Sequence, residues 1–245
     1  MTKIVQIYRS IIVVFFICFF GVGALVVRYC LLPFKKERIQ KYETLQKSWQ
    51  IYISLLKFFK VIEFEPDNSE ILKNIKNSII VSTHPSFLDI VLLMSIIPHS
   101  TCFVADKLAR NPFFKGMVKL LFILEGQPMD KWVNDACEML ENGINIIIFP
   151  MGGRHMKDEH PRIRRGAALI ARKSKRNIVM LQINNDFAFL AGHQPVYRAG
   201  SKPTVYTIKY LGEINTAEYI EKYPDEVDFK TEISKEIAKN LYAKE

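Results

Sequence analysis

The chain has 245 residues, 49% of them hydrophobic, and a formal net charge of +9. This length can bury one sizeable core, and the sequence has no internal repeats or Gly-rich linkers, which argues against a second globular domain. The four cysteines, Cys18, Cys30, Cys102 and Cys137, form no close pair. Their spacing therefore suggests neither a disulfide framework nor a zinc site.

Residues 10–27 are an uncharged apolar stretch of about the minimum length for a membrane-spanning helix. A cleaved signal peptide is the alternative, but the run is long and no small-x-small site precedes Arg28, which favours an uncleaved anchor. Lys3 and Arg9 precede the stretch, and more basic residues follow it: Arg28, Lys35, Lys36, Arg38 and Lys41. The positive-inside rule then places the rest of the chain in the cytoplasm. We predict a transmembrane anchor over 1–33 and one domain over 34–245, with a re-entrant or monotopic helix as the alternative.

Residues 50–63 form a second apolar stretch, in which Lys57 and Lys60 are three positions apart. A segment of this kind lies in the membrane interface or packs as a helix in the core. The sequence favours neither interpretation.

After residue 75, strand-like and helix-like segments alternate, which predicts an α/β fold with a mixed sheet flanked by helices. The expected strands cover 78–83, 101–104, 144–149, 177–183 and 204–210. The expected helices cover 86–97, 112–122, 130–142, 164–174 and 226–242.

The segment 82–89 places an imidazole and a carboxylate just beyond the first of these strands. His84 follows the strand directly, and Pro85 suits the first turn of the next helix. Ligands bind at the carboxyl ends of strands in open α/β sheets, where Asp89 could hold one ring nitrogen while the other faces a substrate hydroxyl. Five positions do not share a face of one regular helix, so His84 must lie in the preceding turn. A lone His-x4-Asp pattern is weak evidence.

Two further segments add weight to this pair. The strand at 144–149 delivers Gly152, Gly153 and Arg154 to the same expected rim. The glycines let backbone amides approach an anion, and the guanidinium can fork onto a phosphate. Between the two rim segments, Lys107 and Arg110 belong to a basic turn that leads into an apolar helix.

In order and spacing, these segments resemble the blocks His-x4-Asp, Lys/Arg-Pro-x-x-Gly and Phe-Pro-Glu-Gly-Thr-Arg of the glycerophosphate-type acyltransferases, the lysophosphatidic acid acyltransferase family. The resemblance covers about residues 75–212. It implies that His84 is the general base that deprotonates the acceptor hydroxyl and that Asp89 orients it. It also implies a set of substrate-binding residues, namely Lys107, Arg110, Gly152, Gly153, Arg154 and Arg165. The last of these belongs to a basic-Gly-Ala stretch at 164–168.

Two positions depart from the family blocks. Met151 stands where the family usually has glutamate, and Gly153 stands where it usually has threonine. Because a carboxylate near the acceptor is lost, we expect a preferred acceptor other than lysophosphatidic acid, or slow turnover. His84 and Asp89 are retained, which argues against an inactive enzyme. Residues 184–186 and 195–197 resemble a branch associated with bacterial aryl-polyene clusters more than they resemble the housekeeping phosphatidic acid enzymes.

The resemblance implies an acyl thioester donor, acyl-coenzyme A or acyl carrier protein, and a lysophospholipid-like acceptor at a bacterial inner membrane. It implies neither a cofactor nor a metal. Transfer in a single step is expected, since no Gly-x-Ser-x-Gly elbow supplies a serine nucleophile. Two alternatives stay open: a hydrolase that uses Ser86, and a lipid-binding protein without catalytic activity.

Much of the positive charge lies between residues 154 and 176, where only Asp158 and Glu159 oppose it. Anionic membrane lipid, an acidic carrier protein or nucleic acid could all bind such a cluster. The expected anchor and the lack of interleaved aromatic residues argue against nucleic acid. His155 and His160 flank the two acids, but exposed loop histidines beside charges are far commoner than a metal loop of this kind.

Overall fold

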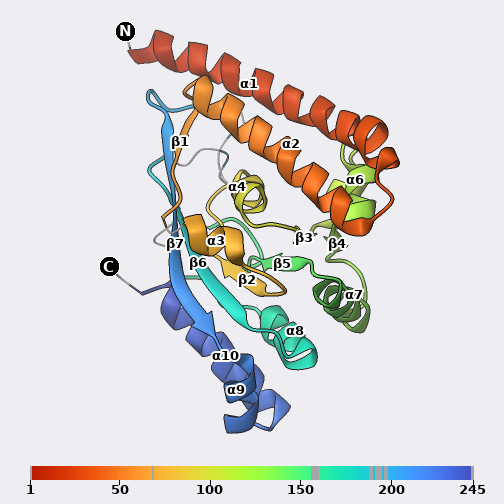
Figure 1. Cartoon of the computed structure of the whole chain (residues 1–245). Helices are drawn as coiled ribbons and strands as arrows, with labels where there is room; N and C mark the ends of the chain where they lie inside the picture. Colours follow the sequence, from red (N-terminus) through yellow and green to blue (C-terminus); the bar gives the residue numbers. More distant parts are fainter. Residues whose placement is uncertain are drawn as a thin grey trace.

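The computed structural model describes residues 2–67, 69–155, 160–187, 190, 195 and 198–243. Seven strands form its central sheet: β1 (Ile62–Phe64), β2 (Ile79–Ser82), β3 (Ser100–Val104), β4 (Ile123–Leu124), β5 (Asn145–Ile148), β6 (Ile178–Asn185) and β7 (Thr204–Ile214). Their order in the sheet is β1-β7-β6-β2-β5-β3-β4 (Figure 1). All neighbours are parallel except β6 and β7, which are antiparallel, so the predicted mixed α/β sheet is confirmed.

The central strands are buried along their whole length. Both β2 and β5 consist mainly of isoleucine and valine without polar alternation, as expected of strands covered on both faces. Strand β7 instead alternates buried and exposed residues over its first half. One face of β7 therefore points outward, and its first half packs by the other.

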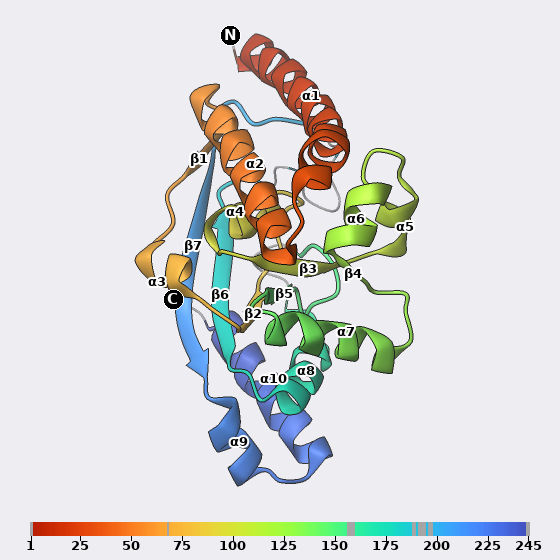
Figure 2. The same cartoon turned by 45° about the vertical axis from the view of Figure 1, so that its right-hand side comes forward.

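The helices are α1 (Thr2–Val26), α2 (Arg38–Phe58), α3 (Ser69–Asn74), α4 (Asp89–Ile96), α5 (Asp106–Arg110), α6 (Lys115–Leu121), α7 (Met129–Glu141), α8 (Gly166–Ser174), α9 (Thr216–Lys222) and α10 (Glu226–Leu241). A π-helical turn, Val27–Leu31, and a 3-10 turn, Leu32–Phe34, join α1 to the loop before α2. Helices α2 and α4 cover one side of the sheet and α7, α8 and α10 the other. Figures 1 and 2 both show α1 side by side with α2, on the side away from the sheet.

Helix α1 has one face packed on the domain and one face open. Val13 and Phe16 are buried in the common hydrophobic core. The Arg9 guanidinium donates to four backbone carbonyls, of Lys60, Val61, Gly200 and Lys202. The outward face exposes large apolar side chains: Ile4, Ile7, Ile11, Phe15, Phe19 and Val22. Within the described residues, the segment Ile4–Phe34 is the one helical stretch long and apolar enough to cross a membrane, by length and composition.

The apolar stretch at 50–63 forms the end of α2 and the turn after it. Ile53 and Leu56 are buried against the core, whereas Ile51 and Phe58 are exposed. The stretch therefore packs into the core by one face, and contact of its other face with a membrane stays a prediction.

The longer predicted elements correspond to observed ones. The 21-residue helix α2 was anticipated only in part, through the apolar stretch at 50–63, and the other elements that the prediction missed are short. Strands β1 and β4 have three and two residues, and helices α3, α5 and α9 have six, five and seven. A periodic pattern needs a longer window than these segments offer. The helix expected from residue 86 begins at Asp89, because a turn precedes it.

Candidate active site

The carboxyl ends of four parallel strands build one edge of the sheet. Strand β5 pairs with β2 and with β3, and β3 pairs with β4, all in parallel. Parallel neighbours end at the same edge, so the segments that follow these strands meet there. This geometry brings His84 after β2 next to Phe149 after β5.

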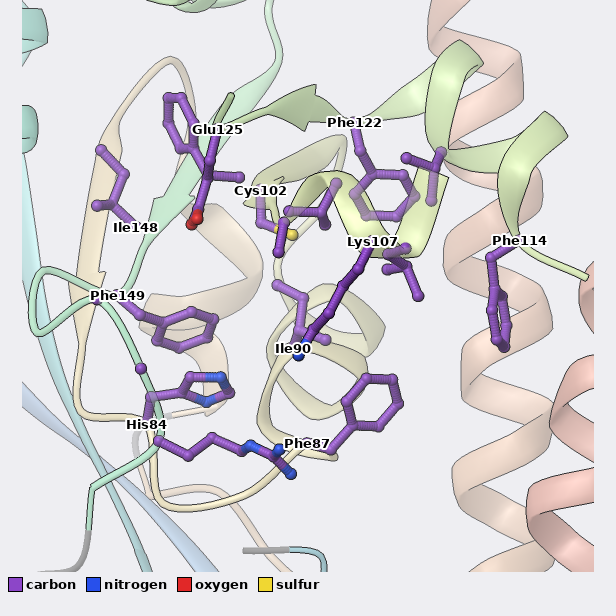
Figure 3. Close-up of a pocket in the computed structure, with 18 of the residues that line it drawn as sticks. His84, Phe87, Ile90, Cys102, Lys107, Phe114, Phe122, Glu125, Ile148 and Phe149 are labelled. Atoms are coloured by element: carbon purple, nitrogen blue, oxygen red, sulfur yellow. The ribbon is translucent and has the colours of Figure 1, made fainter. Parts of the chain in front are cut away.

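His84 and Asp89 form a close pair. The Nδ1 atom of His84 lies 2.8 Å from Oδ2 of Asp89, whose side chain is fully buried. The Phe149 ring stacks on the imidazole with centroids 3.9 Å apart and planes 14° from parallel, as Figure 3 shows. Because the carboxylate accepts the Nδ1 proton, Nε2 of a neutral imidazole is the atom left to accept another.

Burial raises the pKa of the Asp89 carboxyl above its ordinary value. The hydrogen bond from His84, the backbone N–H of Ser86 and the positive charge of Arg154 act in the opposite direction. No partner of Oδ1 occurs within the part of the chain that the structure describes. An imidazolium at His84 would thus pair with a carboxylate held in a medium of low dielectric, where charge pairing is stronger than in water.

Ser86 joins the pair through the start of α4. Its Oγ accepts the N–H of Leu88 at 3.0 Å, and its own N–H donates to Asp89 Oδ2 at 2.7 Å. Together these bonds close the Ser-x-x-Asp turn that leads into α4, whose first helical residue is Asp89. The pattern is readable in the sequence, where Ser86 appeared only as an alternative nucleophile. The Ser86 side chain is fully buried and is not among the residues that line the cavity described next.

A cavity of about 870 Å³ opens beside His84. Figure 3 shows Lys107 extending into it, with Cys102 and Glu125 further from the imidazole. Burial raises the pKa of the Cys102 thiol, which keeps this side chain protonated and unreactive at neutral pH. Away from His84, the wall of the cavity is mainly aromatic. The aromatic side chains come from several separate segments of the chain and are Phe20, Trp49, Phe103, Phe114, Phe122 and Trp132.

The glycines after β5 make room for an arginine. Gly152 has a φ of +74°, and a Cβ there would lie 2.1 Å from Cζ of Arg164. Arg164 therefore packs over Gly152, and both line the cavity. Its neighbour Arg165 does not line the cavity and instead donates to Thr231 on α10 at 3.5 Å. The sequence pointed to Arg165, and no local signal separates two adjacent arginines whose directions the tertiary structure decides.

The remaining expected substrate-binding residues divide between the cavity and the surface. Lys107, Gly153 and Arg154 line the cavity, and Arg154 Nη1 donates to the carbonyl of Leu190 at 2.8 Å. Arg110 is exposed on α5 and is not among the lining residues.

Met151 lies on the other side of this loop. It is 7% exposed, belongs to the hydrophobic core and does not line the cavity. Met151 therefore cannot contact an acceptor in the cavity, so the expected effect of this position on acceptor choice cannot be a direct one.

Among the residues that the structure describes, no three His, Cys, Asp or Glu side chains gather as metal ligands. His160 stacks edge-on against Tyr242. The acids Asp158 and Glu159 of the considered metal loop lie outside the described residues, as do Val196 and Tyr197 of the segment compared with the aryl-polyene branch.

Three comparisons with known proteins complete this picture. A family model described as Acyltransferase matches residues 63–213. No curated protein matches the sequence. The fold is similar to the solved structure of the 1-acyl-sn-glycerophosphate (LPA) acyltransferase PlsC from Thermotoga maritima, with a TM-score of 0.71 and 17% sequence identity. That match covers 100% of this chain and 99% of the other.

Proposed function

This chain belongs to the acyltransferase family, and we propose that it moves a fatty acyl group from an acyl thioester to the hydroxyl of a lysophospholipid-like acceptor. The observation that carries the proposal is the His84–Asp89 pair at the polar end of a large and mainly apolar cavity. A hydroxyl nucleophile needs a base at one end of its site, and an acyl chain needs apolar volume at the other.

In the proposed reaction, Nε2 of His84 takes the proton of the acceptor hydroxyl as that oxygen attacks the thioester carbonyl. The tetrahedral intermediate then expels the thiolate as the C–S bond breaks, and the thiolate takes the proton from the imidazolium. Asp89 stabilises the imidazolium between these two steps. The products are an ester and a free thiol, and no acyl-enzyme forms.

Three positively charged side chains at the polar end of the cavity support the proposal that the substrate carries an anionic group. Lys107, Arg154 and Arg164 line the cavity, whereas Glu125 is the one carboxylate among the described lining residues. Arginine can hold a phosphate with two parallel charge-assisted hydrogen bonds. We assign these side chains to the phosphate of the acceptor, and the backbone of Gly152 and Gly153 to the same region.

The open face of α1 supports attachment to a membrane. Its exposed Ile, Phe and Val side chains form an apolar surface on the helix that also supplies Phe20 to the cavity. A lipid acceptor and an acyl chain would then enter from the membrane side. We assign the catalytic part to the cytoplasmic side, since basic residues follow α1, and we assign acyl-coenzyme A or acyl carrier protein as the thioester donor.

An acceptor panel tests the proposal. Purified full-length protein in detergent is incubated with a labelled acyl thioester and, separately, lysophosphatidic acid, lysophosphatidylethanolamine and monoacylglycerol. We expect a labelled diacyl product that requires an acceptor and is formed best with a phosphate-bearing one. Free fatty acid as the sole product would indicate a hydrolase. Lipid binding without any product would indicate a non-catalytic binding protein, and either result overturns the proposal.

A further inference from the structure

Tyr206 reaches the catalytic loop from a distant part of the chain. It lies near the start of β7, pairs with Asn185 at the end of β6, and is fully buried. Because β7 runs antiparallel to β6, its beginning lies at the sheet edge where β2 and β6 end. The Tyr206 hydroxyl donates to Ser86 Oγ at 2.9 Å across 120 residues of sequence.

This contact is linked to the imidazole through Ser86 and Asp89. Ser86 Oγ accepts from Tyr206 and from the N–H of Leu88, while the Ser86 N–H donates to Asp89. Asp89 Oδ2 is also the atom that lies beside His84 Nδ1. The side chains of Tyr206, Ser86 and Asp89 are fully buried and are not among the lining residues, so they reach the substrate only through His84.

We propose that Tyr206 and Ser86 are positioning residues, which fix the Asp89 carboxylate and thereby the orientation and tautomer of His84; this inference rests on the proposed function. The bonds within the turn from Ser86 to Asp89 join Asp89 only to its own segment. The Tyr206 hydroxyl joins this turn to β7, so the start of α4 is held against the sheet that carries His84. Burial and the charge of Asp89 both raise the pKa of Tyr206, so its hydroxyl remains a donor throughout the neutral range.

The alternative is that Tyr206 only fills the core. Tyr42 provides a matched control, because it is also fully buried and donates its hydroxyl to a backbone carbonyl, that of Leu121, at 3.0 Å. Tyr206→Phe and Tyr42→Phe each delete one buried hydroxyl, and their thermal melting temperatures report the shared cost. Only Tyr206→Phe is expected to change the catalytic pair.

The test measures kcat, the KM of donor and acceptor, and the downfield proton NMR signal of His84 Nδ1–H in full-length protein. For Tyr206→Phe we expect kcat to fall about three- to tenfold, the range of one neutral hydrogen bond, with both KM values unchanged. The Nδ1–H signal should shift or broaden. Tyr42→Phe should keep the native kcat and the native signal.

Ser86→Ala covers the case in which Tyr206→Phe does not fold, and where both single variants fold they form a double-mutant cycle with the double variant. Ser86→Ala removes the acceptor of both bonds and should lower kcat at least as much as Tyr206→Phe. The double variant should equal Ser86→Ala, because Tyr206 acts through the Ser86 hydroxyl. A native kcat and a native Nδ1–H signal in folded Tyr206→Phe, or in folded Ser86→Ala, would overturn the inference.

The proposed function can fail separately. If the wild-type protein shows no transfer while the Nδ1–H signal still responds to Tyr206→Phe and not to Tyr42→Phe, the function is wrong and the positioning contact stands. If the wild type transfers and neither variant differs from Tyr42→Phe, the positioning contact is wrong and the function stands.

Discussion

The two ends of the cavity are held in different ways. At the polar end, His84 is fixed by a 2.8 Å contact to a buried carboxylate and by stacking on Phe149, and the Ser86 N–H holds that carboxylate in the turn before α4. At the aromatic end, side chains from α1, from α2 and from the residues that flank α6 meet through ring contacts such as that between Phe20 and Phe114, whose centroids lie 5.6 Å apart. Proton transfer requires a base at a defined position, whereas an apolar chain requires only volume and dry walls.

Helix α1 shows the same contrast within one element. Phe16 is 3% exposed and packs in the core, and the adjacent Phe15 is 61% exposed. The first residue is held by the protein and the second is available to a lipid surface. The largest effects on chemistry should therefore come from the polar end, and effects on membrane attachment from the open face of α1.

The largest effect on the rate of transfer is expected from His84→Ala. Loss of the general base should lower the rate of transfer by about 10²- to 10⁴-fold while the protein stays folded. The control is His99→Ala, because His99 lies away from the cavity and pairs with Glu43. Steady-state rates and thermal melting of both variants measure the effect. A folded His84→Ala protein with a near-native rate would show that His84 is not the general base.

The next largest effect should separate two adjacent arginines. Arg164→Ala removes a cavity-lining guanidinium and should raise the KM for a phosphate-bearing acceptor roughly tenfold to a hundredfold, the value of a charged hydrogen bond. Arg165→Ala makes the same change in charge outside the cavity and should leave this KM within about twofold. The KM for monoacylglycerol should not respond to either variant. Equal effects of both substitutions would indicate general charge attraction instead of a phosphate site.

A smaller effect should follow at the open face of α1. Phe15→Ser removes exposed apolar surface and should lower partitioning into anionic vesicles roughly tenfold at high salt, without loss of stability. Phe16→Ser is the matched variant and should cost about 3–5 kcal/mol of unfolding free energy, as a large-to-small core change does. Flotation assays and chemical denaturation read the two results. Unchanged partitioning of Phe15→Ser would show that membrane attachment lies elsewhere.

The smallest effect is expected at Met151. Met151→Leu keeps the volume of a core side chain and should change the unfolding free energy by less than about 1.5 kcal/mol, with the acceptor ranking unchanged. Met151→Glu should destabilise the protein, because it places a charge in the core. An altered acceptor ranking with Met151→Leu would show that the position acts on the cavity from behind.

The sequence predicted the position of His84 and Asp89 at the rim of the cavity because that part of the structure is local. His84, Pro85 and Asp89 lie within one strand–turn–helix unit, and the spacing itself requires His84 to precede the helix. The buried strands were equally readable, since unbroken runs such as Ile146–Ile148 have few other structures available.

Contacts between distant segments could not be read from the sequence. Tyr206 and Ser86 are 120 residues apart, and the antiparallel pairing of β7 that joins them leaves no local pattern. The direction of Arg164 depends on space over Gly152, which only the folded loop reveals. The packing of α1 along α2 was also hidden, because an apolar run reads alike whether protein or lipid covers it.

Rapid mixing of full-length protein with a labelled acyl thioester, followed by quenching and mass spectrometry of the protein and the lipids, distinguishes direct transfer with His84 as the base from transfer through an acyl-enzyme. We expect no acyl group on the protein with or without acceptor. Ester product should form only when acceptor is present, and its burst should be lost in His84→Ala. An acyl adduct on Ser86 that decays when acceptor is added would show that transfer is not direct, and product formation by His84→Ala at the wild-type rate would show that His84 is not the base.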